Sequence, residues 1–285
     1  MQIVTCVAEL KTIIRSARAA GKTIGVVPTM GYLHEGHLTL MRKARAEQGV
    51  VIATIFVNPL QFGPQEDYAV YPRDLKRDSA MAETTGIDVL FAPSVDEMYP
   101  AGNGRTLTFV DVEQITTKLC GASRPGHFRG VATVVAKLLN ITEADVGYFG
   151  QKDAQQVTVI RRMVDDLNMN VKIVAVPIVR ESDGLALSSR NQYLSPDERQ
   201  AALVLSKSLV RAQELLQLGE KDSGQILAVM NDLISRDPLA RIEYISIVDP
   251  AALEPLQQIS GPALIALAVR FGKTRLIDNL IWEGK

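Results

Sequence analysis

The apolar runs Ile24-Gly-Val-Val-Pro28 and Val50-Val-Ile-Ala-Thr-Ile-Phe-Val57 decide the fold class. Neither run alternates between apolar and polar residues, and such continuous runs are typical of parallel strands that are covered on both faces. A helical pattern between Gly36 and Glu47 separates them. A strand, a helix and a second buried strand predict a right-handed βαβ unit.

The same alternation continues outward from this unit. We expect helices at residues 7–20, 73–83, 131–138 and 154–167, and strands at residues 88–93, 146–149 and 171–176. Residues 105–112 interrupt the rhythm and are expected to form an extra strand pair or an excursion. Strands alternating with helices predict a Rossmann-like, doubly wound parallel sheet.

After Ser195-Pro196 the pattern changes. Ser195 is expected to cap one long helix that starts at Pro196 and reaches Leu218, followed by a second helix at residues 223–235. Three extended runs follow at residues 242–247, 263–269 and 275–282. Helices followed by grouped strands predict a smaller α+β domain. We therefore expect two domains, residues 1–182 and residues 183–285.

Composition excludes several other classes of protein. The chain has 285 residues with 31 Lys and Arg against 32 Asp and Glu, and this lack of basic excess argues against a dedicated nucleic-acid binder. The longest apolar stretch is far below the roughly 20 residues that span a bilayer, and no signal peptide is visible. Two cysteines outside any CxxC pair make a disulfide framework improbable. We expect a soluble, cytoplasmic protein with no membrane partner.

Two of the three histidines lie in Thr29-Met-Gly-Tyr-Leu-His34-Glu-Gly-His37, where the first strand passes into its helix. Ligands of open α/β sheets bind beyond the carboxyl ends of the strands, near helix N-termini that attract anions. Residues three apart share one face once they are helical. The pattern indicates a His-x-Gly-His nucleotide site in which the imidazoles donate hydrogen bonds to phosphates, and Gly36 permits a close approach of the backbone.

Three other kinds of site fit this segment less well. It has the glycine spacing of a P-loop, but His37-Leu38 replaces the Lys-[Ser/Thr] pair that such a loop needs. Zincins need histidines four residues apart and a third ligand nearby, whereas this pair is three apart. No G-x-G-x-x-G follows the strand. A pair of merely structural, hydrogen-bonded histidines stays open.

Further polar clusters follow other strands or lie in connections. Gly150-Gln-Lys-Asp-Ala-Gln-Gln156 opens a helix after a predicted strand, and Lys152 there suits a phosphate, although Asp153 could simply cap the helix. Asp183-Gly-Leu-Ala-Leu-Ser-Ser-Arg-Asn191 lies in the presumed interdomain connection and could be an ordinary turn. Asn58 and Gln61 follow the second strand, and Ser123 to Gly130 is expected to be a mobile wall or lid.

These segments together resemble the pantothenate synthetase (pantoate–β-alanine ligase) family. The resemblance rests on six motifs in order and extends to Arg275-Leu-Ile-Asp-Asn279, which covers essentially the whole chain. Two departures are visible, because Gln151 stands where the family usually has Glu and Ala154 where it usually has an aromatic residue. The motifs are Pro28 to His37, Phe56 to Phe62, Tyr71-Pro-Arg73, Gly121 to Arg129, Gly150 to Gln156 and Asp183 to Asn191.

The resemblance implies an ATP-dependent ligase that works in two steps. The carboxylate of (R)-pantoate attacks the α-phosphorus of ATP, which gives pantoyl adenylate and pyrophosphate. The amine of β-alanine then attacks the adenylate, which releases AMP and pantothenate, a precursor of coenzyme A. The resemblance also implies that Mg²⁺ accompanies ATP, held mainly by its phosphates, and that the enzyme is a homodimer with small-molecule substrates.

By the same resemblance, His37 is the candidate proton donor to the leaving group, and His34, Lys152 and Arg190 are the other catalytic candidates. Gln61 and Gln156 are expected to hold pantoate, with Asn58 beside them. No metal ligand is assigned, and Asp78 is a candidate carboxylate neighbour of the magnesium ion. The expected ATP-binding residues are Met30, Gly31, Tyr32, Leu33, His34, Glu35, Gly36, His37, Gly150, Gln151, Lys152, Asp153, Val179 through its backbone, Leu187, Ser188, Ser189 and Arg190.

Two alternatives remain at this point. A related His-x-Gly-His nucleotidyltransferase that moves AMP onto another acceptor would share the histidines but lack the paired glutamines. A catalytically silent nucleotide sensor would bind ATP without turnover, although Lys152 and Ser188-Ser-Arg190 argue against it.

Overall fold

The computed structural model describes residues 1–64, 66–101 and 106–284, which form two compact units. Unit 1 comprises Met1–Thr117, Gly121–Gln151 and Val159–Pro177, and unit 2 comprises Lys118–Cys120, Lys152–Thr158 and Ile178–Lys285. The expected domain limits, 1–182 and 183–285, stay a prediction. No helix in the described ranges is long and apolar enough to cross a membrane.

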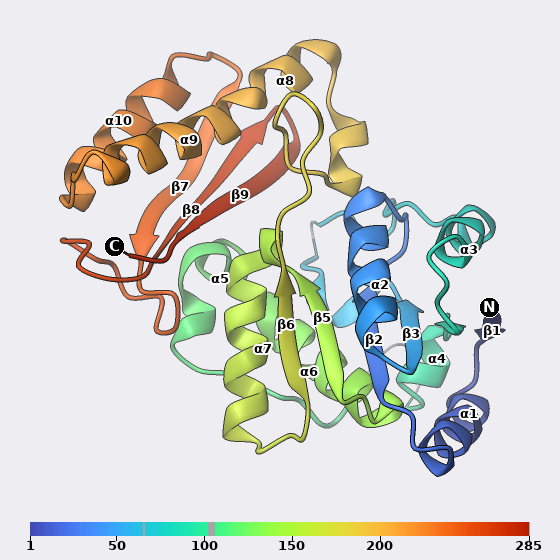
Figure 1. Ribbon diagram of the computed structural model, residues 1–285. Helices are drawn as coiled ribbons and strands as arrows, with labels where there is room; N and C mark the ends of the chain where they lie inside the picture. Colours follow the sequence, from blue (N-terminus) through green and yellow to red (C-terminus); the bar gives the residue numbers. More distant parts are fainter. Residues whose placement is uncertain (65, 102–105, 285) are drawn as a thin grey trace. The chain divides into compact units, whose positions relative to one another are not determined.

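Unit 1 is built on a parallel sheet with the strand order β1-β4-β3-β2-β5-β6 (Figure 1). Buried side chains point to both of its faces, since neighbouring residues such as Val26 and Val27 are both fully buried. The predicted doubly wound parallel sheet is confirmed. The strands are β1 (Gln2–Val4), β2 (Ile24–Thr29), β3 (Val50–Ile55), β4 (Val89–Phe91), β5 (Val146–Gly150) and β6 (Lys172–Val176).

The order of the strands fixes where a ligand site belongs. Along the chain, β3 and β4 add on one side of β2, and β5 and β6 then add on its other side. The direction of winding therefore switches between β2 and β5, and such a switch leaves a crevice at the carboxyl ends of the two strands. The segment that holds both neighbouring histidines follows β2, and Gln151 follows β5.

The helices of this part agree with most of the expectations. Helix α2 packs through Leu38, Met41 and Ala44 against a core that includes Val27 and Val51. The helices before residue 177 are α1 (Val7–Ala19), α2 (Glu35–Glu47), α3 (Leu75–Glu83), α4 (Val95–Met98), α5 (Leu119–Ser123), α6 (His127–Thr142) and α7 (Ala154–Asp166), with 3-10 turns η1 (Pro59–Gln61), η2 (Ile115–Thr117) and η3 (Gln151–Asp153). Of these, α5, η3 and α7 contain residues of both units.

One helix start needs correction, and one strand was not expected. The helix expected from Arg73 begins at Leu75, because Asp74 accepts a hydrogen bond from the backbone of Arg77 and caps it. The helix expected from Ala154 is confirmed as α7, and the turn η3 leads directly into it. Residues 106–112 form no strand, which leaves the excursion of the two expected forms, and Arg105 lies outside the described residues. Strand β1 was not expected, because its three residues bury only one side chain.

Unit 2 contains an antiparallel sheet of β7 (Ala240–Val248), β8 (Ala263–Phe271) and β9 (Thr274–Trp282). Helices α9 (Leu203–Gln217) and α10 (Ser223–Ser235) share its buried core. The predicted α+β character and the three extended runs are confirmed. The turn η4 (Ser189–Tyr193) precedes the helices.

The long helix expected from Pro196 to Leu218 is wrong in one respect. Ser195 and Pro196 begin helix α8 as predicted, but α8 ends at Ala201 and α9 starts at Leu203. Ala201, Ala202 and Leu203 are all buried. One face of a straight helix does not bury three residues in succession, so the break at Ala202 lets both segments face the core.

Candidate active site

The segment after β2 is held in a tight turn. Gly31 and Tyr32 both have positive φ angles, 83° and 48°. A Cβ at Gly31 would lie 2.9 Å from Cγ2 of Ile55, so only glycine fits against the neighbouring strand. The hydroxyl of Thr29 accepts a hydrogen bond from the backbone of Gly31 at 3.2 Å. The backbone of the expected nucleotide loop is therefore fixed by local packing.

His34 and His37 lie side by side, but not in the way the spacing suggested. His34 is the N-cap of α2 with extended backbone, and only His37 is inside the helix. The ring centroids are 4.0 Å apart. The backbone N–H of His34 donates to Nδ1 of His37 at 3.3 Å. Because Nδ1 accepts, neutral His37 carries its proton on Nε2, which can donate to a phosphate oxygen.

Asp78 reaches this turn from α3. Its carboxylate is 1% exposed, and its two oxygens accept the backbone N–H groups of Tyr32 and Leu33, both at 2.7 Å. Burial raises the pKa of Asp78, and the two hydrogen bonds and Arg77 oppose that effect. Both carboxylate oxygens therefore bind the backbone of the turn. Among the described residues, no group of three or more His, Cys, Asp or Glu side chains is arranged to hold a metal ion.

Gln61 is joined to the same turn. Its Nε2 donates to the sulfur of Met30 at 3.1 Å, and its Oε1 accepts from Nδ2 of Asn58 at 3.1 Å. The expected ATP-binding residue Met30 and the expected pantoate-binding residue Gln61 are thus in contact. The amide orientation is set by Asn58, whose Oδ1 accepts the hydroxyl of Tyr99 at 2.7 Å and whose Nδ2 also donates to Gly130 O at 3.1 Å.

Tyr99 is a member of this network that the sequence analysis missed. It is 1% exposed, and burial raises its pKa, so the hydroxyl stays a donor. No spacing or motif in the sequence singles out Tyr99, because it follows the four-residue helix α4 and reaches Asn58 across 41 positions of the chain. Only the tertiary structure identifies it.

The segment from Ser123 to Gly130, expected as a mobile wall or lid, is divided between two helices. Ser123 ends α5, and His127 already begins α6. Arg124 forms an ion pair with the half-buried Glu66 at 2.6 Å. Burial raises the pKa of Glu66, but Arg124 outweighs this effect, so the pKa is lowered overall. Nδ1 of His127 lies 2.7 Å from the carbonyl oxygen of Gln61, and since a carbonyl only accepts, Nδ1 carries the proton. These contacts fix the segment to the turn that holds Gln61.

Unit 2 carries the second set of expected residues. Lys152 is half-buried, its carbonyl accepts from Nδ2 of Asn279 at 2.9 Å, and no carboxylate of the described chain pairs with its ammonium. Gln155 is fully engaged, because its amide binds the backbones of Lys118 and Cys120. Gln156 is half-buried, and no described residue forms a hydrogen bond with its amide. Lys152 and Gln156 therefore have side chains available for a ligand.

Residues 179–191 form a hairpin-like loop in unit 2. The carbonyl of Val179 accepts the N–H of Leu187 at 3.0 Å, and Ser188 caps η4 by accepting the N–H of Arg190. Nδ2 of Asn191 donates to Ala186 O at 3.1 Å. The segment expected to bind the triphosphate is therefore an ordered turn with defined backbone contacts, and Leu187, Ser188, Ser189 and Arg190 belong to it.

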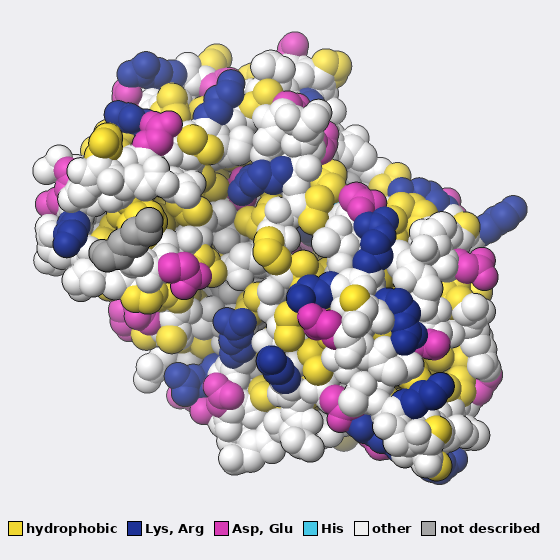
Figure 2. All heavy atoms as spheres, viewed as in Figure 1, with side chains coloured by type: hydrophobic (Ala, Val, Ile, Leu, Met, Phe, Trp, Pro, Cys, Tyr) yellow, Lys and Arg dark blue, Asp and Glu magenta, His cyan; other side chains and the backbone are white. Residues whose placement is uncertain are grey.

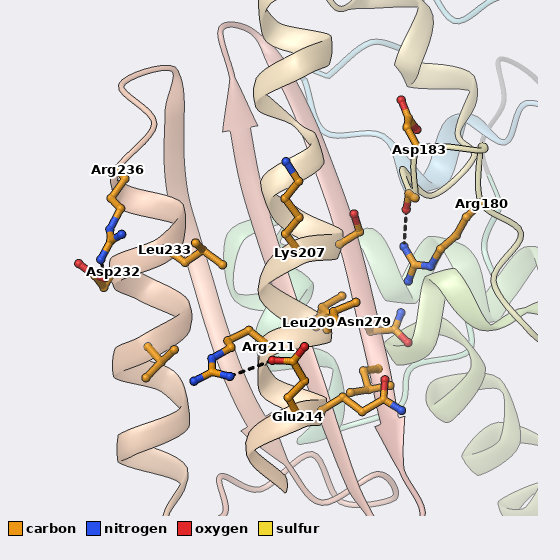
Figure 3. Close-up of a pocket in the computed structure, with 16 residues that line it drawn as sticks. Arg180, Asp183, Lys207, Leu209, Arg211, Glu214, Asp232, Leu233, Arg236 and Asn279 are labelled. Atoms are coloured by element: carbon orange, nitrogen blue, oxygen red, sulfur yellow. Dashed lines mark hydrogen bonds and ion pairs between the residues drawn. The ribbon is translucent and has the colours of Figure 1, made fainter. Parts of the chain in front are cut away.

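A cavity of about 730 Å³ lies in unit 2, lined by α9, α10, β9 and part of the 179–191 loop (Figure 3). Among the described residues that line it, none is an expected ATP-binding or pantoate-binding residue. Three of its cations form ion pairs, Arg180 with Asp278, Arg211 with Glu214 and Arg236 with Asp232. Figure 2 shows acidic and basic side chains intermixed on the visible face, without a field of one sign.

The parallel sheet with polar residues beyond β2 and β3 defines an α/β protein of the nucleotide-binding class. The family model of pantoate-beta-alanine ligase matches residues 2–281. The chain therefore belongs to the pantoate–β-alanine ligase family, and the resemblance noted from its motifs is confirmed.

Individual relatives agree with this assignment. The chain is 60% identical over 283 residues to the pantothenate synthetase of Heliobacterium modesticaldum, which covers 99% of this chain and 100% of the relative. It is 57% identical to that of Pelotomaculum thermopropionicum over 99% of both chains. The crystal structure of pantothenate synthetase from Thermus thermophilus is 49% identical with a TM-score of 0.91, covering 98% of this chain and 99% of that one.

A more distant structure carries ligands. The pantoate-beta-alanine ligase of Francisella tularensis, complexed with beta-gamma ATP and beta-alanine, is 37% identical, with a TM-score of 0.78. The match covers 99% of this chain and 97% of that one. Its ligands are those of that protein.

Proposed function

We propose that this protein condenses (R)-pantoate with β-alanine at the expense of ATP, through pantoyl adenylate, and releases AMP and pyrophosphate. The contact between Met30 and Gln61 carries the proposal, because it joins the nucleotide turn to the amide that would hold the acid substrate. Transfer at phosphorus depends on alignment and charge neutralisation more than on covalent protein chemistry. The family of the chain and the ligands of the Francisella tularensis relative support it.

Each group has a role in the proposed first step. Gln61 donates to the pantoate carboxylate or hydroxyls through the one Nε2 proton that is not donated to Met30, and Gln156 donates to pantoate from α7. His37 donates from Nε2 to the leaving pyrophosphate, with His34 beside it. Lys152 neutralises phosphate charge as a point cation.

The other expected contacts belong to the same proposal. Asn58 orients Gln61 and does not itself bind substrate, because all four hydrogen-bonding positions of its amide are used inside the protein. Asp153 would hold the ribose and Val179 the adenine. The remaining ATP contacts are assigned to Gly31, Tyr32, Leu33, Glu35, Gly36, Gly150, Gln151, Leu187, Ser188, Ser189 and Arg190.

Three further features of the proposal come from the family resemblance. Magnesium enters as the ATP complex, bound by phosphate oxygens, which are the hard ligands that it prefers. The enzyme works as a homodimer, which sedimentation equilibrium would test. It works in the cytoplasm, where Cys6 and Cys120, which form no disulfide, would stay reduced.

Isotope exchange tests the reaction and its order. With pantoate and magnesium but without β-alanine, the protein should exchange labelled pyrophosphate into ATP. The physical reason is that a carboxylate is a poor acyl donor until AMP becomes its leaving group, so activation precedes amine attack. Exchange that strictly requires β-alanine would overturn the two-step order. Exchange supported only by a different acceptor would indicate another nucleotidyltransferase, and ATP binding without any exchange would indicate a sensor.

Gly130→Ala should weaken the binding of pantoate by displacing η1, the turn that carries Gln61. A Cβ at this position would lie 2.2 Å from the carbonyl oxygen of Leu60 and 2.6 Å from the backbone nitrogen of Gln61. Backbone atoms cannot move aside as a flexible side chain can, so η1 must shift. We expect a loss of about 1–3 kcal/mol in unfolding free energy and a KM for pantoate that rises more than the KM for ATP.

Steady-state kinetics and urea unfolding would measure both effects. Gly261→Ala is the matched control, because a Cβ there meets no atom within 4 Å. Equal pantoate KM values in Gly130→Ala and Gly261→Ala would contradict the predicted coupling.

A further inference from the structure

The contact between Asp78 and the nucleotide turn joins residues far apart in the sequence. Asp78 lies in the first turn of α3 and accepts from Tyr32 and Leu33, which precede it by 46 and 45 positions. Its exposed fraction is 1%. Both oxygens of one buried carboxylate are therefore directed at two successive backbone N–H groups.

The turn needs such an anchor because its backbone is unfavourable. Gly31 tolerates its φ of 83°, but Tyr32 has a φ of 48°, which a residue with a Cβ adopts rarely. A conformation of this kind persists only when its surroundings hold it. The turn ends at Leu33, and His34 follows directly as the N-cap of α2. An error in the turn would therefore be passed directly to both histidines.

Arg77, in the same helix, also binds the turn, and we call Arg77 and Asp78 together the clamp. Its Nη2 donates to the carbonyl of Leu33 at 2.9 Å, and its guanidinium lies 4.8 Å from the ring centroid of Tyr32. It also pairs with Asp78, Nη1 to Oδ1, at 3.3 Å. Together Arg77 and Asp78 bind both N–H groups of residues 32 and 33, the carbonyl of residue 33 and the aromatic ring.

We propose that Asp78 is a positioning residue, which fixes the Gly31–Leu33 turn so that His34 and His37 are aligned for the phosphates of ATP. The proposal rests on the proposed function for its kinetic consequence, but the placement of the histidines does not depend on substrate. The role requires a carboxylate, because both of its oxygens must accept a hydrogen bond. An amide of the same shape offers one acceptor and turns an NH₂ group towards one of the two N–H groups.

The test compares Asp78→Asn with Asp74→Ala. Asp74 caps the same helix by accepting from the backbone of Arg77, and among the described residues no hydrogen bond joins its carboxylate to residues 31–33, so its loss controls for weakening of α3. In pyrophosphate exchange, Asp78→Asn should lower kcat or raise the KM for ATP at least tenfold, with the KM for pantoate unchanged within twofold. Asp74→Ala should stay within threefold of the wild type in all three values.

A second readout requires no activity. The chain has three histidines, so their ring nitrogens can be resolved by ¹⁵N NMR. Asp78→Asn should move the signals of His34 and His37 most, while His127, whose ring is held by the Gln61 carbonyl and Arg124 rather than by residues 31–33, serves as the internal reference. Signals of His34 and His37 that match the wild type would overturn the proposal, as would an identical change in Asp74→Ala.

Arg77→Gln provides the same test if Asp78→Asn fails to fold. It removes the contacts to Leu33 and Tyr32 and leaves the buried carboxylate in place, and it should move the same two histidine signals with a three- to tenfold loss of exchange rate. Unmoved signals in a folded Arg77→Gln would count against the clamp. A wild-type protein without pantoate-dependent exchange would refute the proposed function alone, because the histidine signals would still decide the role of Asp78.

Discussion

Replacing His37 by alanine should lower the rate of adenylate formation by about 10²–10³-fold, the usual effect of removing one preorganised donor to developing charge. Nδ1 of His37 accepts the backbone N–H of His34, so neutral His37 carries its proton on Nε2, the donor proposed to meet a phosphate. Alanine removes that donor and offers nothing in its place. The fold should survive, since the loss at the helix start amounts to about 1 kcal/mol, as for other caps.

Single-turnover formation of pantoyl adenylate at saturating ATP measures this effect directly. Lys43→Ala is the control on the same helix, because the Lys43 side chain is 40% exposed and pairs only with Glu47 in the described structure. The melting temperature of His37→Ala should stay within a few degrees of the wild type. Near-normal turnover of His37→Ala would remove His37 from the proposed proton transfer.

Replacing Lys152 by alanine should have a similarly large effect, about 10²–10³-fold on the adenylation rate, because it removes a cation from a polyanionic transition state. The backbone of Lys152 is fixed by Asn279, so its ammonium starts from a defined position. No described carboxylate pairs with that ammonium, and its charge is therefore not already neutralised inside the protein. The KM for ATP should rise as well.

Three variants separate charge from shape in this test. Lys152→Met keeps most of the side-chain volume and should be as impaired as Lys152→Ala, whereas Lys152→Arg should recover part of the rate. Lys273→Met, at the exposed β8–β9 turn of the same unit, removes an equal charge and should behave as the wild type. If Lys152→Met retained the wild-type rate and KM, a direct phosphate contact would be wrong.

Much of the architecture could be predicted because its signals are local. The continuous run at Val50 to Ile55 is typical of a strand buried on both faces, and Ser195 with Pro196 is a local signal for the start of a helix. The antiparallel strands of unit 2 likewise follow from extended apolar runs. By contrast, the break at Ala202 carries no local mark and depends on what lies beneath α8 and α9.

The candidate site shows the same division. The order of the motifs singled out His34, His37, Gln61 and Lys152 as substrate-binding residues. It did not reveal that His34 caps the helix and sets the tautomer of His37. The resemblance also suggested Asp78 as a neighbour of the magnesium ion, whereas both of its oxygens accept hydrogen bonds from the backbone of the nucleotide turn.

The sequence alone determined the class of fold, the order of its elements and the family, because periodicity, capping and motif order are properties of neighbouring residues. The tertiary structure decided which buried groups hold those motifs in place. Tyr99 reaches Asn58 across 41 positions, and Asp78 reaches Leu33 across 45. Contacts at such separations depend on how strands order within the sheet and which helix covers which strand, and no local pattern encodes them.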